Sequence, residues 1–98
     1  MSTLEEAKNM MNKINIQAKV IDKGEPRTVN KKDGGTIDVC DAKLEDESGT
    51  MKLTLWGDDI PKVNVGDTVK INNGFTNIFK GEVSLQKGKF GQMEVTAS

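Results

Sequence analysis

A chain of 98 residues with 35% hydrophobic and 30% charged side chains can bury one hydrophobic core, which excludes a second domain and a deep cleft between lobes. No apolar run approaches the roughly 20 residues that cross a bilayer, and the acidic N-terminus MSTLEEAKNM lacks a secretory signal, so we expect a cytoplasmic protein and not a membrane protein. With 14 basic and 15 acidic residues, the net charge of -1 excludes binding of nucleic acid by bulk positive charge and leaves only local basic clusters.

Residues 3–13 have the pattern of a short N-terminal helix. Thr3 and Glu6 have the spacing of a capping box, and apolar residues recur at helical spacing at Leu4, Ala7, Met10 or Met11, and Ile14. We predict that a helix over residues 1–13 packs against one end of a single domain formed by residues 14–98. The alternative is a helix that provides a face for oligomerisation or for a partner.

The first two predicted strands are separated by a long polar connection, GEPRTVNKKDGG. Over residues 14–23, apolar and polar side chains alternate with the period of two that is typical of a strand. Over residues 36–45, Ile37 and Val39 are followed by Cys40, Ala42 and Leu44, so the apolar parity changes by one position. We predict a β-bulge near residues 39 and 40, which bends the strand and keeps both apolar groups inside. Cys40 is then a residue of the core.

The third predicted strand, residues 50–56, ends on the only tryptophan of the chain. Alternation in MKLTLWG places three apolar residues on one face and Trp56 on the other, together with Lys52 and Thr54. This parity predicts that Trp56 is exposed. The alternatives are a tryptophan that covers the rim of the fold, or a bulge that turns it inward.

Two further segments complete a set of five strands. Val69 and Ile71 alternate with polar residues in a fourth strand, and a last strand or hairpin contains apolar residues on both sides of the loop QKGKFGQ, at Val83, Leu85, Met93 and Val95. Five short strands favour a closed barrel, because closure removes exposed strand edges. We therefore predict an all-β fold, a five-stranded OB-fold barrel with a short N-terminal helix. An SH3-like barrel is the alternative.

The side chains that most catalytic and metal sites require are missing. The chain has no histidine and one cysteine, which removes the commonest general base, the nucleophile pairs that need histidine, and zinc-finger spacing. Adjacent carboxylates such as Asp58 and Asp59 lie in turn-like segments, and Gly34 and Gly35 lack the strand-to-helix context of a phosphate loop. We predict a binding module that is not an enzyme and has no cofactor or metal.

Four aromatic residues, Trp56, Phe75, Phe79 and Phe90, are candidates for stacking on nucleic-acid bases. Gly74 interrupts the alternation, so the pattern leaves both core and surface open for Phe75 and Phe79. Phe90 lies in a loop rich in lysine and glycine, where exposure and packing of a hairpin are both open.

Basic residues gather in two segments, 23–34 and 80–89, whereas acidic residues gather in 38–47. In OB-folds, the loop between the first two strands and the loop between the last two flank the face that binds oligonucleotides. A tryptophan at the end of the third strand would lie on that face, between the two basic segments. The predicted phosphate contacts are Arg27, Lys31, Lys32, Lys80, Lys87 and Lys89.

The motifs DESG, LTLWG, VGDTVKI and FKGEVSL lie within residues 35–86. This segment resembles the OB-fold domain of the simple archaeal single-stranded-DNA-binding proteins, which are related to the domains of replication protein A, and a weaker similarity extends over 14–34. The resemblance implies that bases stack on Trp56, Phe75 and Phe79, with Phe75 standing where the family often has a larger aromatic. It also implies that the first loop contacts the DNA backbone through Arg27, Lys31 and Lys32.

The function that this resemblance implies is non-catalytic binding of single-stranded DNA in replication, recombination or repair, with replication or repair proteins as partners. We expect a monomer. A second interpretation is an adaptor that docks a protein partner through the same aromatic face, which the net negative charge permits. Binding of RNA or tRNA is a third, because stacking alone does not sense the 2′-hydroxyl.

Overall fold

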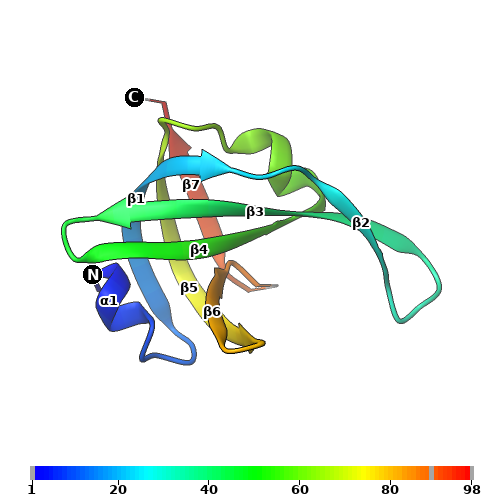
Figure 1. The fold of residues 1–98 in the computed structure, drawn as a ribbon, viewed down its shortest axis with the longest axis horizontal. Helices are drawn as coiled ribbons and strands as arrows, with labels where there is room; N and C mark the ends of the chain where they lie inside the picture. Colours follow the sequence, from blue (N-terminus) through cyan, green and yellow to red (C-terminus); the bar gives the residue numbers. More distant parts are fainter. Residues whose placement is uncertain (1, 89, 98) are drawn as a thin grey trace.

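The computed structural model describes residues 2–88 and 90–97, with the exception of the side chain of Phe79. Within these residues the elements follow the order α1 (Leu4–Ala7), β1 (Ile14–Lys23), β2 (Arg27–Asn30), β3 (Thr36–Asp46), β4 (Gly49–Trp56), the 3-10 helix η1 (Gly57–Lys62), β5 (Thr68–Phe79), β6 (Glu82–Gln86) and β7 (Gln92–Thr96). Five strands close into a ring in the order β1, β3, β4, β6, β5 and back to β1 (Figure 1). Neighbours in the ring are antiparallel except β4 and β6, which are parallel. The predicted all-β barrel is confirmed.

Two strands lie outside the ring. Among the described residues β2 pairs with β3 alone, and the β2–β3 hairpin forms the arm that extends to the right of the barrel in Figure 1. The sequence predicted a polar connection here, because three of the four side chains of β2 are exposed and no apolar alternation marks it as a strand. Strand β7 pairs with β5, so the last predicted hairpin is instead two strands, β6 and β7, that both lie against β5.

The N-terminal helix is shorter than predicted. The capping box that begins at Thr3 is present, but the helix ends at Ala7. The segment that follows lies against β5, where the backbone N–H of Thr76 donates a hydrogen bond to the carbonyl of Met11 at 3.1 Å. The helix has the packing role that we expected, because both of its apolar residues are buried in the core, Leu4 and Ala7.

Strand β3 changes the face of its apolar residues at positions 39 and 40 without bending. Its register with β2 and β4 is uninterrupted there, so the predicted β-bulge is wrong, and the register shifts lie instead in the pairings of β1. Cys40 is buried in the core opposite Leu55, which confirms its predicted position, and burial raises the pKa of its thiol. Val39 lies opposite Trp56, outside the core cluster. Val39 is buried, but it lies on the same face as Trp56 and not in the core cluster.

Candidate nucleic-acid interface

The outer face of β3 and β4 presents paired side chains. Because directly opposed residues of an antiparallel pair point to the same face, Trp56 shares this face with Val39, and Thr54 shares it with Asp41. The positions between them face the core. Trp56 is 38% exposed, as its parity in the sequence predicted.

A hydrogen bond holds the indole ring of Trp56. Its Nε1–H donates to Oε1 of Gln86 at 3.2 Å, and Gln86 itself is only 8% exposed. Gln86 lies opposite Thr54 on β4 and opposite Phe75 on β5. Through its hydrogen bond to Trp56, it links the indole ring to the strand position next to Phe75. A ring that is already oriented loses less freedom when a ligand stacks on it.

The other predicted stacking residues come from β5. Phe75 is half-buried and packs against Gly88, since a Cβ placed on that glycine would lie 2.7 Å from Cε1 of the ring. Phe79 is the last residue of β5 and pairs with Glu82, and its side chain lies outside the described part of the structure. Phe90 is 81% exposed, which agrees with the exposed interpretation of its loop.

Two hollows accompany these residues. A pocket of about 240 Å³ lies beside Trp56, and its lining combines apolar and polar residues, among them Leu53, Leu55, Met93, Thr54, Asp59, Gln86 and Lys87. A larger hollow of about 610 Å³ extends over the outer face and includes Asp41, Lys43, Lys52 and Glu82. Lys52 borders the larger hollow and Thr54 and Trp56 border the smaller one, and these three residues alternate along one face of β4.

Four charged side chains alternate in sign across β2, β3, β4 and β6. Nη1 of Arg27 lies 3.1 Å from Oδ2 of Asp41, Nζ of Lys52 lies 3.3 Å from the same oxygen, and Lys52 also lies 2.9 Å from Oε1 of Glu82. Partial burial raises the pKa of Asp41, but the hydrogen bonds from Arg27 and Lys52 outweigh it and leave that pKa lowered. The hydrogen bond to Glu82 raises the pKa of Lys52. Partial burial lowers this pKa, but the interaction with Asp41 raises it further, so the pKa is raised overall. Asp41 and Lys52 are therefore held in their charged forms at neutral pH.

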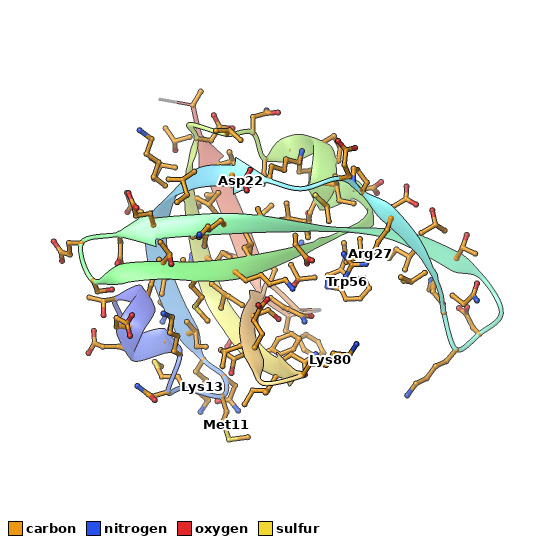
Figure 2. All side chains as sticks on the ribbon, viewed as in Figure 1. Met11, Lys13, Asp22, Arg27, Trp56 and Lys80 are labelled. Atoms are coloured by element: carbon orange, nitrogen blue, oxygen red, sulfur yellow. The ribbon has the colours of Figure 1, made fainter. Side chains whose placement is uncertain are left out.

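In the view of Figure 2, Arg27 at the start of β2 is drawn above Trp56, and Lys80 in the turn between β5 and β6 is drawn below it. The register agrees for Arg27, which lies opposite Val39, the residue that lies opposite Trp56. Lys80 and Gly81 have φ of +53° and +81°, the two left-handed residues of a tight hairpin turn, and Lys80 is exposed there.

The remaining predicted phosphate contacts are more widely spread. Lys31 and Lys32 are exposed where β2 turns into β3, and Lys31 lies 3.8 Å from the carboxylate of Asp33. Lys87 is 3.0 Å from a carboxylate of η1 and borders the pocket beside the tryptophan. Lys89 lies outside the described residues. The structure thus brings Arg27 and Lys87 close to Trp56, and it places Lys31 and Lys32 on the hairpin arm.

Sequence reasoning did not identify Asp41 or Gln86 as residues of this surface. It placed Lys52 on the face of Trp56 through the parity of MKLTLWG, but it did not include Lys52 among the phosphate contacts. Asp41 and Gln86 reach the surface because of the register between neighbouring strands, which periodicity within one strand does not reveal.

Comparison with known proteins gives independent evidence. The family model described as "Single-stranded DNA binding protein Ssb-like, OB fold" matches residues 3–95. The chain is 37% identical over 78 residues to the single-stranded DNA binding protein Ssb of Saccharolobus solfataricus, over 80% of this chain and 52% of that protein. It is 39% identical over 61 residues to Replication factor A of Methanothermobacter thermautotrophicus, over 61% of this chain and 8% of that protein. These matches select the OB-fold over the SH3-like barrel.

A solved structure of a replication protein A heterotrimer bound to single-stranded DNA contains a similar fold. The TM-score is 0.76 at 17% identity, over 100% of this chain and 25% of that one, and at this identity the likeness shows the fold alone. The chain spans about half the length of the Ssb relative and a small part of Replication factor A. No helix in the residues that the structure describes is long and apolar enough to cross a membrane.

Proposed function

The chain belongs to the Ssb-like OB-fold family of single-stranded DNA binding proteins, and from this membership we propose that it binds single-stranded DNA in replication, recombination or repair. It is a binding protein and not an enzyme. The proposed mechanism combines stacking of bases on aromatic rings with contacts to phosphates. The stacking residues are Trp56, Phe75 and Phe79, and the phosphate contacts are Arg27, Lys31, Lys32, Lys80, Lys87 and Lys89.

The observation that carries this proposal is the position of Trp56 in register with Arg27 on the outer face, with Val39 between them. An exposed aromatic ring offers a surface on which any base stacks, and a neighbouring guanidinium offers charge to the phosphate. The bond from the indole to Gln86 supports the same role, because it orients the ring before DNA arrives.

The test is a titration of the fluorescence of Trp56, the only tryptophan, with a thymidine oligonucleotide. Stacking of a base on the indole is expected to quench the emission strongly, and blunt duplex DNA, whose bases are already stacked, is expected to quench it far less. Unchanged emission from the folded protein contradicts the proposal and favours the adaptor that docks a protein. A uridine oligonucleotide in parallel separates a preference for DNA from one for RNA.

We also propose that the DNA-binding unit is a monomer and that its partners are proteins of replication or repair. The ring of five strands closes within one chain, so the barrel needs no second copy to complete it. Light scattering should give the mass of one chain without DNA. A dimer mass at low micromolar protein contradicts the monomer.

A further inference from the structure

Two cationic side chains converge on one oxygen atom of the outer face. Arg27 Nη1 and Lys52 Nζ lie 3.1 and 3.3 Å from Oδ2 of Asp41, and the hydroxyl of Thr54 donates to the other oxygen at 3.4 Å. The donors come from β2 and β4, and the acceptor comes from β3, which lies between them. An oxygen placed where Oδ2 lies is therefore contacted by both cations at once.

This cluster is open to solvent. The side chains of Arg27, Lys52 and Asp41 are 57%, 35% and 28% exposed. Ion pairs at such exposure contribute little to folding, so the exchange of one anion for another demands little of the fold. A diester phosphate carries the same single charge as the carboxylate and presents oxygens to the same donors.

The cluster also lies at the right place along the strand. Asp41 is opposite Thr54, which precedes Trp56 by two residues on the same face of β4. Two residues of a strand span about 7 Å, so a chain whose base stacks on the indole passes the cluster with its backbone. Arg27 lies opposite Val39, which lies opposite Trp56, and the guanidinium of Arg27 extends from this position to Asp41.

We propose that Arg27 and Lys52 form a binding site for one backbone phosphate, and that the carboxylate of Asp41 occupies this site in the free protein. Bound DNA displaces the carboxylate, and Asp41 thereby lowers the affinity of a surface that would otherwise hold the backbone more tightly. This inference rests on the proposed function. It adds Lys52 to the phosphate contacts and gives an acidic residue of the binding face a role opposite to theirs.

The experiment compares Asp41→Asn with the wild type in binding to a fluorescein-labelled thymidine oligonucleotide. Asn keeps the shape of Asp without its charge, so Arg27 loses its ion pair and Lys52 keeps only the one to Glu82. We expect the affinity to rise by about three- to tenfold, as the loss of two exposed ion pairs in the free protein predicts. The slope of log affinity against log salt should stay close to the wild-type value, because the same phosphate is contacted in both proteins.

The matched control is Glu45→Gln. Glu45 lies on the same face of β3, opposite Thr50, is exposed, and makes no ion pair among the described residues. The Glu45→Gln variant removes the same charge but breaks no ion pair of Arg27 or Lys52, so its affinity for the oligonucleotide should change less than twofold. An equal gain in Glu45→Gln shows that only net charge matters and overturns the proposed site.

A second variant tests Lys52 directly. Lys52→Gln should lower the affinity more in the Asp41→Asn protein than in the wild type, because in the wild type Asp41 already occupies Lys52. Equal losses in both proteins contradict the site. If Asp41→Asn does not fold, Asp41→Ser replaces it in the same cycle. A wild type that binds no oligonucleotide refutes the proposed function itself, whereas a wild type that binds and an Asp41→Asn variant of unchanged affinity refute only this site.

Discussion

The indole nitrogen of Trp56 and the side-chain oxygen of Gln86 are 3.2 Å apart, and this hydrogen bond joins an exposed ring on β4 to an almost fully buried amide on β6. The two strands are parallel neighbours in the ring. The register places Gln86 opposite Thr54, which precedes Trp56 by two residues on β4. The orientation of the proposed stacking surface therefore depends on a residue that is hardly accessible to DNA.

Gln86→Leu should weaken binding of a thymidine oligonucleotide, although residue 86 is too buried to contact the DNA itself. The variant keeps the volume of the side chain but removes the acceptor, so the indole loses one hydrogen bond worth about 1 kcal/mol and with it a fixed orientation. Anisotropy of a labelled oligonucleotide measures the affinity. Gln92→Leu, an exposed position of β7, is the control and should bind like the wild type. Equal affinity for both variants means that the bond does not orient the ring for binding.

Alanine at each proposed stacking residue should lower the affinity by about 1 to 3 kcal/mol, the worth of one base stacked on an aromatic ring. Trp56→Ala should leave the unfolding midpoint nearly unchanged, because Trp56 is 38% exposed. Phe75→Ala should also lower it, because Phe75 is half-buried against Gly88. Phe90→Ala serves as the control for an aromatic outside the proposed surface. If Trp56→Ala destabilises the protein as much as the loss of a core side chain does, the exposed role of Trp56 is wrong.

Gly88→Ala should separate the effect of strain from the position of Phe75. Gly88 and Gly81 have φ of +77° and +81°, so alanine at either position is strained by about 1 to 2 kcal/mol. A methyl group at Gly88 would also meet the ring of Phe75 at 2.7 Å, whereas nothing lies within 4 Å at Gly81. Thermal unfolding should show a loss for both variants, larger for Gly88→Ala because of the contact with Phe75, and only Gly88→Ala should lose affinity for DNA. Similar affinities would mean that Phe75 does not contribute to binding.

Much of the barrel could be predicted from the sequence, because its strands are half-buried and alternate with a period of two. β1 has the predicted bounds of 14–23, and β3 and β4 begin and end within one residue of prediction. The prediction failed for the face on which Val39 lies. Val39 is 2% exposed, so its burial was predicted correctly, but in the register it lies between Arg27 and Trp56 and not on the face of the core cluster.

The candidate surface was only partly predictable, for a related reason. Trp56 and Arg27 were found because parity and composition are properties of one segment. Asp41 and Gln86 become part of the surface through pairing between strands that are distant in sequence, and the register depends on the whole ring. The assignment of Phe75 came from the family resemblance, since Gly74 hides its periodicity.

Acid should destabilise the protein partly through Asp46. Its carboxylate accepts hydrogen bonds from the backbone N–H of Leu4 at 2.8 Å and from Ser48, and so ties α1 to the β3–β4 turn. Partial burial raises the pKa of Asp46, but these bonds outweigh it and the pKa is lowered. The stabilisation is therefore complete above the ordinary pKa of about 3.9 and is lost as pH falls through the lower folded value.

Asp46→Asn tests this linkage. At pH 7 the variant should unfold more easily by about 1 to 2 kcal/mol, the worth of hydrogen bonds to a charged group. Urea unfolding at a series of pH values should show the difference from the wild type shrinking below about pH 4. Asp58→Asn, which removes a carboxylate without a hydrogen bond among the described residues, controls for the loss of one charge. A difference that is constant with pH contradicts the role of the ionised carboxylate.

Salt dependence tests whether DNA runs along the β2–β3 hairpin. The net charge is -1, so only local basic residues release counterions, and about three neutralised phosphates give a slope near -2 in log affinity against log salt. Replacing both Lys31 and Lys32 with Ala should flatten that slope by about one unit and lower the affinity for all base compositions alike. The control pair is Lys19→Ala with Lys70→Ala, on β1 and β5, neither of which pairs with β2 among the described residues, and it should leave the slope within about 0.3 of the wild type. If the Lys31 and Lys32 double variant keeps the wild-type slope, the DNA backbone does not pass the arm, and its path must follow β4 toward Lys80 instead.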